Sequence, residues 1–391
     1  MNQQTKTKNK FRDQFCHFVK DEVGVAALHD LESKVVKPTE LDTDIIVVGS
    51  SIVHMARALV LASFGARVTV LEQSRSYGGV WSTAETVGLT GVERAPHIFM
   101  PCKIAYRFIE TVIGIEMVEM DPHPMLITLN ENYALQSRGC FPSTPVTSHP
   151  NVMYEGVCRQ PNGGANVLFK KLIRLGEKMG IRFVSEAYVK TLSLMDCHVK
   201  AKGSFGEVTG RRVVMSRGSP VTHIYDGHAV IIPYRSSTNI SLHLLVEATM
   251  KPGFSFVHVD GHPLIKEIHD ISNCTKGIAT DRRLIIVKLR YNIFEQNDLS
   301  LIDSKEVFED LVGFGLFAST NRVVESEITG YAQTRIGESA IEDLSNRYEP
   351  CLDIVPFSTL ADKSRRADLC AQDMSVSLSA KEFYQTLAGA W

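Results

Sequence analysis

The alternation of apolar and polar residues is clearest over residues 44–72. It begins with a short apolar run, Ile45-Ile46-Val47-Val48, which is rich in β-branched residues. Such a run is typical of a strand buried on both faces of a parallel sheet. Apolar residues then recur at helical spacing over 52–62, and Gly65 ends that segment. Residues 67–71 predict a second strand, so the stretch predicts a β-α-β unit.

Polar residues follow each of these two strands. Gly49-Ser50-Ser51 separates the first strand from the helix, and Glu72 ends the second strand 23 residues after Gly49 (72 − 49). In such units the helix N-terminus binds a pyrophosphate, and the acid accepts hydrogen bonds from ribose hydroxyls. Gly49, Ser51 and Glu72 are therefore candidate cofactor-binding residues. Ser51 and His54 replace the second and third glycines of the usual G-x-G-x-x-G pattern, so a crossover without a ligand is the alternative.

The next segments resemble a known group of flavoproteins. Gly78-Gly79-Val80-Trp81 and Pro96-His97-Ile98-Phe99 follow the β-α-β unit. With them the sequence resembles the glutathione-reductase-like FAD superfamily, in particular the amine oxidase and phytoene desaturase group and the UDP-galactopyranose mutases. Residues 96–99 are similar to a mutase segment that runs under the flavin. The resemblance implies cofactor contacts by Gly78, Gly79 and Trp81, and a catalytic position facing the substrate for His97.

Residues 161–190 carry the resemblance further along the chain. Pro161-Asn162-Gly163-Gly164 precedes an amphipathic helix that ends near Gly180, and a strand follows over 181–184. This order is similar to a segment of the amine oxidase group that leads back into the FAD-domain sheet. The family's valine beside the adenine ring would fall on Val189, which would act through its backbone.

The C-terminal part adds four residues that the resemblance implies. Residues 327–335 look like a strand from which the family points a tyrosine or arginine toward the substrate. Val376, Leu378 and Leu387 belong to a predicted amphipathic helix, which would begin beside the flavin. The implied catalytic residues are Tyr331 and Arg335, and the implied cofactor-binding residues are Asp373 and Met374.

These elements predict an α/β protein: a Rossmann-like FAD/NAD(P)-binding domain with an inserted α+β substrate domain. Strands at about 192–201 and 207–216 would form a small β-meander that closes the FAD-binding domain. The expected divisions are an N-terminal helical extension over 1–40, the FAD-binding domain over 41–218 with a loop-rich insertion at about 104–149, the substrate domain over 219–330, and a C-terminal segment over 331–391 that returns to the FAD-binding domain.

The N-terminal extension contains a predicted amphipathic helix with an apolar side made of Phe11, Phe15, Phe18 and Val19. Packing on the core is the favoured interpretation. Contact with a partner chain, as in a homodimer, is the alternative.

Composition narrows the classes of partner. The 391 residues carry a net charge of −2, which gives no electrostatic case for nucleic acid or an anionic membrane. No apolar run approaches the length of about 18 residues that a membrane-spanning helix requires. The eight cysteines are scattered without C-x-x-C spacing, so we expect reduced thiols in a cytoplasmic protein. Three neighbouring histidines, His258, His262 and His269, are interpreted as hydrogen-bonded or solvated, and no metal site is expected.

Three hypotheses of function follow. The favoured one is an FAD-dependent oxidoreductase of the amine oxidase-like group that acts on a small-molecule substrate. The second is a UDP-galactopyranose mutase-like flavoenzyme, which would isomerise a nucleotide sugar, because of residues 96–99 and the Asp373-Met374 pair. The third is a non-catalytic scaffold or subunit with a degenerate cofactor site, because Ser51 and His54 replace glycines.

Overall fold

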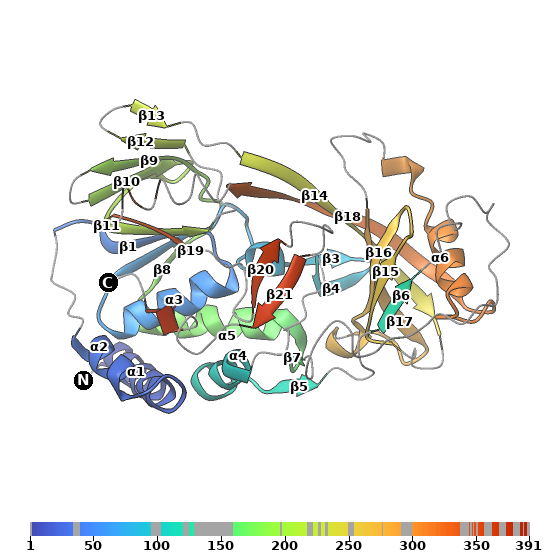
Figure 1. The fold of residues 1–391 in the computed structure, drawn as a ribbon, viewed down its shortest axis with the longest axis horizontal. Helices are drawn as coiled ribbons and strands as arrows, with labels where there is room; N and C mark the ends of the chain where they lie inside the picture. Colours follow the sequence, from blue (N-terminus) through green and yellow to red (C-terminus); the bar gives the residue numbers. More distant parts are fainter. Residues whose placement is uncertain are drawn as a thin grey trace.

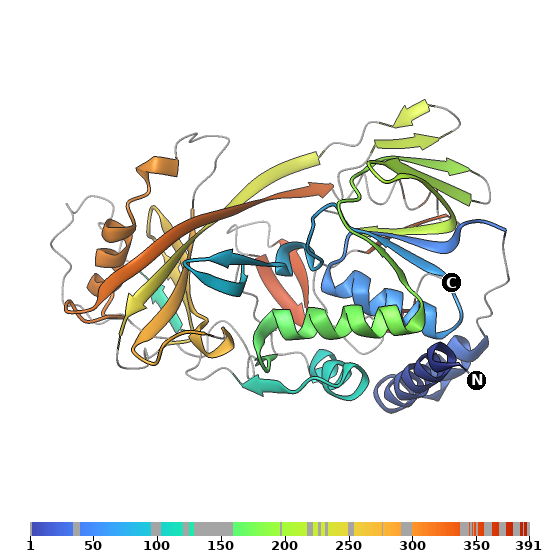
Figure 2. The same cartoon turned by 180° about the vertical axis from the view of Figure 1, so that it is seen from behind.

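Two large sheets lie at opposite ends of the molecule, and the helices α1, α3 and α5 lie against one of them (Figures 1 and 2). This arrangement comes from a computed structural model. The model describes residues 2–33, 40–94, 103–119, 125–128, 159–195, 198–216, 222–225, 228–230, 234–248, 254–275, 277–290, 299–336, 344, 346, 348, 351–355, 362–366, 373–377, 384–385 and 387–388.

The first sheet contains a parallel core in the strand order β8-β2-β1-β11-β19. Numbered along the chain this is the 3-2-1-4-5 order of a doubly wound fold, so the predicted Rossmann-like α/β class is confirmed. β1 lies at the centre, where Val47 is in register with Val70 and Val214. The strands are β1 (Thr43–Val48), β2 (Val68–Leu71), β8 (Arg182–Val184), β11 (Gly206–Ser216) and β19 (Leu352–Val355).

The two faces of this sheet are covered differently. Ile45 and Val47 of β1 face a core that is shared with the helices, whereas Ile46 and Val48 face the meander. This split follows from the period of two residues in a strand. The helices on the first face are α1 (Gln3–Glu22), α2 (Val25–Ser33), α3 (Ile52–Ser63), α4 (Lys103–Arg107), the π-helix η2 (Phe108–Ile113) and α5 (Gly164–Met179).

The N-terminal helix packs on this core, as predicted. Phe11, Phe15, Phe18 and Val19 of α1 are all buried. The Phe15 ring lies 6.2 Å from the Phe108 ring in an edge-to-face arrangement, a geometry that aromatic pairs prefer.

The meander departs from the prediction at one point. The single strand expected at about 192–201 is two antiparallel strands, because Met195 is in register with His198. Next to the turn, the buried positions change from Leu192 and Leu194 in the first strand to Val199 and Ala201 in the second, from even to odd numbers, which marks the reversal. The meander consists of β9 (Val189–Met195), β10 (His198–Gly203) and the first part of β11, and two short strands extend it, β12 (Thr222–Tyr225) and β13 (His228–Val230).

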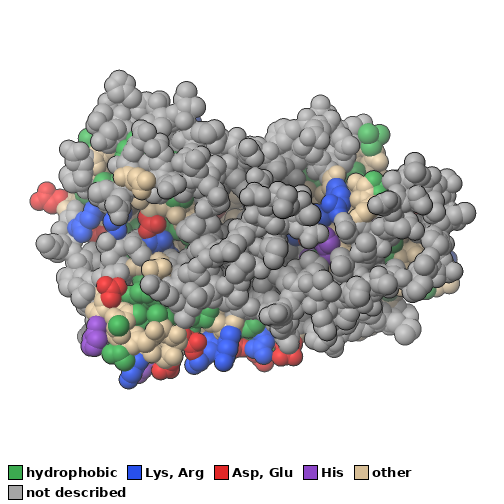
Figure 3. Space-filling view, viewed as in Figure 1, with side chains coloured by type: hydrophobic (Ala, Val, Ile, Leu, Met, Phe, Trp, Pro, Cys, Tyr) green, Lys and Arg blue, Asp and Glu red, His purple; other side chains and the backbone are tan. Residues whose placement is uncertain are grey.

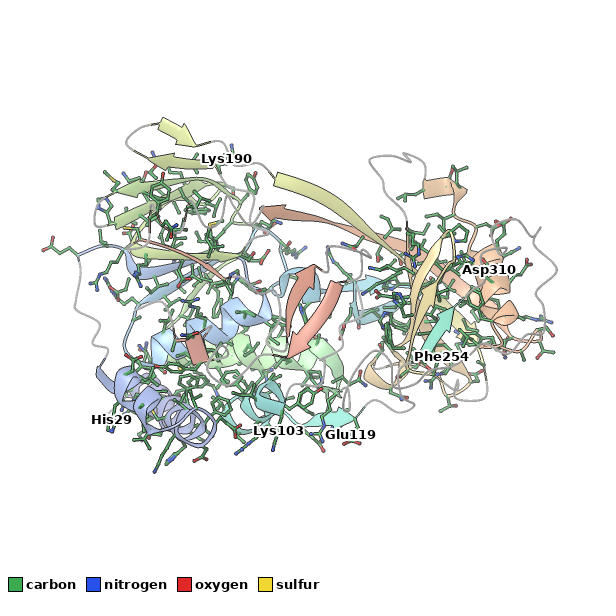
Figure 4. All side chains as sticks on the ribbon, viewed as in Figure 1. His29, Lys103, Glu119, Lys190, Phe254 and Asp310 are labelled. Atoms are coloured by element: carbon green, nitrogen blue, oxygen red, sulfur yellow. The ribbon has the colours of Figure 1, made fainter. Side chains whose placement is uncertain are left out.

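The second sheet has the order β18-β14-β17-β16-β15-β6 and is antiparallel except for the β15–β6 pair. Its core packs against α6 (Ser304–Gly313), and Phe254 and Asp310 lie in this half of the molecule (Figure 4). Strand β6 comes from the segment expected to be a loop-rich insertion. The strands are β6 (Met125–Thr128), β14 (Tyr234–Glu247), β15 (Phe256–Asp260), β16 (Ile265–Asp270), β17 (Arg282–Leu289) and β18 (Arg322–Ile336).

Short strands and single-turn helices complete the fold. The β3–β4 hairpin lies between the two sheets in Figures 1 and 2. The short strands and single-turn helices are β3 (Thr83–Thr86), β4 (Leu89–Glu93), β5 (Met117–Glu119), β7 (Arg159–Pro161), β20 (Asp362–Arg366), β21 (Asp373–Ser377), η1 (Gly79–Trp81), η4 (Ser272–Cys274) and η5 (Leu299–Leu301).

The prediction that a helix begins near Asp373 is wrong. Residues 373–377 form β21, in which Asp373 is in register with Arg366 of β20. The sequence Asp-Met-Ser-Val-Ser alternates polar and apolar residues, and that period of two favours a strand. Helical residues occur later, at 384–385 and 387–388, where Tyr384 and Leu387 are buried in the same core as α1.

The face drawn in Figure 3 carries charges of both signs. Along its lower edge, where α1, α4 and β5 lie, both Lys or Arg and Asp or Glu side chains are exposed. Within the described part of the chain, no helix is both long and apolar enough to cross a membrane.

Candidate functional site

The turn after β1 lies where a doubly wound sheet binds nucleotides, at the carboxyl ends of its strands. Gly49 has a φ of +93°, a left-handed conformation that favours glycine, and its N–H donates to the Leu71 carbonyl at 2.8 Å. Ser51 is the N-cap of α3. The first N–H groups of this helix therefore face the end of β1, which is an arrangement that binds anions.

Glu72 closes this turn from the end of β2. Its side chain is buried, with a relative exposure of 3%. Oε2 accepts hydrogen bonds from the Ser50 N–H at 3.0 Å and the Ser50 hydroxyl at 2.6 Å, and Oε1 accepts from the Ser74 N–H at 2.8 Å. A carboxylate has about four acceptor positions. One of them remains for a ligand when the hydrogen bonds within the described ranges are counted.

A second glycine turn lies against the first. The Gly78 N–H donates to the Ser50 hydroxyl at 2.8 Å. Gly78 and Gly79 both have positive φ values, and a Cβ added to Gly79 would lie 3.9 Å from the Ser51 nitrogen. The structure thus brings together Gly49, Ser51, Glu72, Gly78 and Gly79, five of the residues predicted to bind a cofactor.

Two other predicted cofactor residues lie beside this cluster. Trp81 has a relative exposure of 2% and packs in the core, 6.5 Å from the Phe169 ring of α5, so it supports the second turn from the protein interior. The Ala187 N–H donates to the backbone carbonyl of Glu72 at 2.8 Å. This bond holds Ala187, two residues before Val189 at the start of β9, next to the end of β2.

His54 occupies the position of the third glycine and is almost completely buried, at 1% exposure. Its Nδ1 lies 3.4 Å from the point where a Cβ on Gly49 would be. No side chain among the described residues hydrogen-bonds either ring nitrogen, and the Met215 backbone on β11 is the polar group beside the ring. Burial, followed by the charge of Arg57, lowers the pKa of His54 from 6.5 to about 4, so the ring is neutral at pH 7.

One turn further along α3, Arg57 forms an ion pair with Asp353 of β19. The Arg57 side chain is 3% exposed and the Asp353 side chain 25% exposed. Burial lowers the pKa of Arg57, and the Asp353 carboxylate opposes that effect. This pair connects the helix that follows the turn to the edge strand of the parallel core.

These residues fit a dinucleotide in the chemistry of their donors and acceptors. Two glycine turns and a helix N-terminus offer backbone N–H groups to a diphosphate. Glu72 keeps one acceptor position, which suits a ribose hydroxyl. The buried His54 ring, which no described side chain hydrogen-bonds, lies next to the turn and carries an N–H donor.

A second polar cluster, which the sequence reasoning missed, lies between the β3–β4 hairpin and the second sheet. His243 of β14 is fully buried, and its Nε2 lies 3.0 Å from the Thr329 hydroxyl and 3.4 Å from the Arg94 carbonyl. Burial lowers the pKa of His243 from 6.5 to about 4. The only signal in the sequence is a polar residue inside the apolar run Leu242–Val246, and a run of this kind does not reveal which residues the histidine contacts.

Glu327 extends this cluster on β18. It accepts the Val87 N–H at 3.0 Å, and this bond, together with one from Thr86, lowers the pKa of Glu327. Val87 is a non-glycine residue with φ +43°, so the carboxylate holds a strained turn of the hairpin.

The remaining predicted site residues lie apart from these clusters or outside the described residues. His97 is outside them. The backbones of Tyr331 and Arg335 lie on β18, in register with Asn239 and Arg235 of β14. Asp373 and Met374 lie on β21 and do not begin a helix, which corrects the prediction that placed them at a helix N-terminus beside the flavin.

The three neighbouring histidines have partners within the second half of the molecule. His262 Nδ1 accepts from the Ile265 N–H at 2.7 Å, and its Nε2 lies 3.4 Å from Asp310. His269 Nε2 lies 3.3 Å from Glu267. Across the ranges that the structure describes, no group of three His, Cys, Asp or Glu residues could hold a metal ion.

Comparison with known proteins finds solved structures with a similar fold. No protein-family model and no curated protein sequence matches this chain. Putrescine oxidase bound to putrescine has a similar structure, with a TM-score of 0.59 and 14% identity, covering 89% of this chain and 98% of that chain. A protein of Exiguobacterium sp. 255-15, described as a candidate protoporphyrinogen oxidase, has a TM-score of 0.58 and 12% identity over 89% and 98% of the two chains.

Reduced UDP-galactopyranose mutase is similar to almost the same degree. Its TM-score is 0.57 at 12% identity, and the match covers 89% of this chain and 93% of that chain. At these identities the likeness shows the fold alone. The chain therefore has the mixed α/β architecture of an FAD-binding Rossmann-like fold together with a second, mostly antiparallel sheet, and the fold itself does not separate an oxidase from the mutase.

Proposed function

We propose that this protein is an FAD-dependent oxidoreductase of the amine oxidase-like group that acts on a small-molecule substrate. The observation that carries the proposal is the meeting of the Gly49 turn, Glu72 and the Gly78-Gly79 turn at the carboxyl ends of β1 and β2. An ordinary crossover needs neither a second glycine turn nor a buried acid at this place.

In this proposal each residue of the cluster binds a particular part of FAD. The N–H groups at the start of α3 would hold the diphosphate, and Glu72 would accept a ribose hydroxyl at its remaining position. The backbone near Val189 would lie beside the adenine ring. When bound, the flavin supplies the redox chemistry, while the protein supplies binding, orientation and electrostatics.

The substrate side would be built from β14, β18 and the segment that follows β4. Thr329 donates to the Arg94 carbonyl at 3.3 Å, which fixes the last described residue before the segment containing His97. His97, Tyr331 and Arg335 are the residues that we propose for contact with the substrate. His243 would act as a positioning residue, because it contacts the Arg94 carbonyl and Thr329 from a buried site.

Purification of the full chain tests the cofactor assignment directly. We expect a flavin absorption spectrum and an FAD mass after denaturation of the purified protein. In Glu72→Ala, FAD affinity should fall about tenfold or more, because a hydrogen bond to a charged group contributes about 1.5–3 kcal/mol. The exposed Glu85→Ala on β3 is the matched control and should leave affinity unchanged. Equal affinity in wild type and Glu72→Ala would contradict the proposed site.

The same preparation separates the oxidoreductase from the mutase. After anaerobic photoreduction, we expect oxygen to reoxidise the flavin and a small-molecule amine or alcohol substrate to reduce it again. Conversion of UDP-galactopyranose by the reduced protein, without net oxidation, would instead support the mutase.

A second candidate function is a non-catalytic subunit with the same fold. It is favoured by one observation, the closure of Glu72 onto Ser50, because the Ser50 hydroxyl takes an acceptor position that a ribose hydroxyl would use. Purified protein that lacks FAD and does not bind it on titration would support this candidate over the enzyme.

A further inference from the structure

His54 is the third residue of α3, which begins at Ile52 after the N-cap residue Ser51. Side chains at this position point back toward the helix N-terminus, because the Cα–Cβ bond of a helical residue tilts that way. Nδ1 and Cε1 of the ring lie 3.4 and 3.7 Å from the point where a Cβ on Gly49 would be. The imidazole is therefore next to the glycine that opens the anion-binding turn.

Burial of a neutral imidazole ring without a side-chain partner is also unusual. At 1% exposure no side chain in the described parts of the chain hydrogen-bonds either ring nitrogen, and the Met215 backbone is the polar group beside the ring. A buried polar group without a partner is unfavourable, and where such groups persist they often serve a ligand. Simple core packing would be achieved better by an apolar side chain of similar size.

Charged groups of both signs lie around the ring. Burial lowers the pKa of His54, Arg57 one turn along the same helix lowers it further, and hydrogen bonding with the Met215 backbone on β11 raises it. Arg57 is itself paired with Asp353 on β19 and lies near Arg212 on β11. The Glu72 carboxylate at the end of β2 is bound to Ser50. The one charge with a stated effect on the ring is that of Arg57, and it disfavours an added proton and attracts an anion.

We propose that His54 donates a hydrogen bond to a phosphate oxygen of the nucleotide that is held at the N-terminus of α3. The proposal rests on the nucleotide site of the proposed function and assigns to that site a side-chain contact that the usual glycine cannot make. His54 is then a binding residue that replaces the close helix packing given by a third glycine.

ADP is the probe for this contact, because it carries the adenosine ribose and a diphosphate but no flavin. We expect calorimetric titration of the full chain to show that His54→Gly binds ADP about tenfold or more weakly than wild type. His54→Gln, which keeps an N–H donor at similar reach, should stay within about threefold of wild type. His29→Gln, at an exposed histidine of α2 (Figure 4), is the control and should bind normally.

Tighter or unchanged binding in His54→Gly would overturn the proposal, since the ring would then fill space that the ligand needs. Circular dichroism and thermal melting of each variant show whether it is folded. If His54→Gly is unfolded, the wild type and His54→Gln are compared by a second measurement.

That second measurement is proton uptake. A phosphate beside the ring should raise the pKa of His54 from its low value in the free protein, so ADP binding at pH 6 should take up part of a proton. Titrations in buffers of different ionisation enthalpy measure this uptake, which should be present in wild type and absent in His54→Gln. Equal uptake in both would overturn the proposal.

The results also separate this inference from the proposed function. If ADP binding requires His54 but purified and titrated protein holds no FAD, the inference stands and the oxidoreductase assignment fails. If FAD is bound equally by wild type and His54→Gly, the assignment stands and the inference fails. If neither ADP nor FAD binds, both fail.

Discussion

The Ser50 hydroxyl lies 2.6 Å from the Glu72 carboxylate and connects the turn after β1 to the end of β2. The same hydroxyl accepts the Gly78 N–H at 2.8 Å. One small side chain therefore joins all three segments of the candidate dinucleotide site. These bonds within the protein hold the two glycine turns together without a ligand.

Ser50→Ala should lower the free energy of unfolding by about 1–3 kcal/mol, because it leaves the buried Glu72 carboxylate and the Gly78 N–H with one partner fewer. Urea unfolding measures the change. Ser326→Ala removes an exposed hydroxyl that lies 3.1 Å from the Ser304 hydroxyl and should change stability by less than about 0.5 kcal/mol. Equal effects in the two variants would show that the Ser50 bonds do not hold the turns.

Removing either member of the Arg57–Asp353 ion pair should lower the free energy of unfolding, but by different amounts. Asp353→Asn leaves a buried guanidinium beside Arg212 and should cost about 3 kcal/mol of unfolding free energy. Arg57→Met should cost less, because Asp353 is partly exposed and regains water. Glu119→Gln, in the exposed pair with Arg159, is the control and should cost less than about 1 kcal/mol. A larger loss for Arg57→Met than for Asp353→Asn would contradict the assigned burial.

Stability should fall as the pH is lowered from 7 to 5. His54 and His243 have pKa values lowered from 6.5 to about 4, so in this window the unfolded chain binds more protons than the folded protein. Each histidine should then remove about 2 kcal/mol of unfolding free energy between pH 7 and pH 5.

Urea unfolding at several pH values measures this slope. In His243→Gln the loss of unfolding free energy between pH 7 and pH 5 should be smaller by the contribution of one buried histidine. His17→Gln, at an exposed position of α1, should leave this loss unchanged. A constant free energy of unfolding between pH 7 and pH 5 would contradict the burial of both rings.

The C-terminal residues should help to hold the N-terminal helices. The Tyr384 hydroxyl lies 3.0 Å from Asp30 Oδ2 and 3.2 Å from the Ala27 carbonyl, both on α2. Tyr384→Phe should therefore cost about 1 kcal/mol and increase hydrogen exchange in α2. Exchange in α6, which lies in the other half of the molecule, serves as the internal control. Unchanged exchange in α2 would mean that the apolar contacts alone hold it.

The central β-α-β unit could be predicted from sequence because each of its signals is local. Ile45–Val48 is apolar throughout, residues 52–62 keep the helical period, and Gly49 stands where a positive φ is needed. The burial of Phe11, Phe15 and Phe18 followed from the same periodicity.

The predictions from sequence failed where the contact that decides the structure joins residues far apart along the chain, or where the apolar residues fit both the helical and the strand period. Residues 373–377 alternate in a way that suits a strand, and pairing with β20 decides between strand and helix. The bond between Ser50 and Glu72 spans 22 residues, and the contact between His243 and Thr329 spans 86. No local pattern specifies such pairs, so the sequence predicted the two glycine turns of the candidate site but not the side-chain bonds that join them.

The strands β14 and β18 stay paired from Tyr234–Ile336 to Glu247–Arg322, with one irregularity near Leu245. This two-stranded ribbon extends from the second sheet toward the first (Figures 1 and 2). A tilt of one half of the molecule against the other would flex the ribbon along its whole length, because its ladder of hydrogen bonds resists a sharp local fold. We therefore expect small, spring-like changes of angle at this connection, and no single pivot residue there.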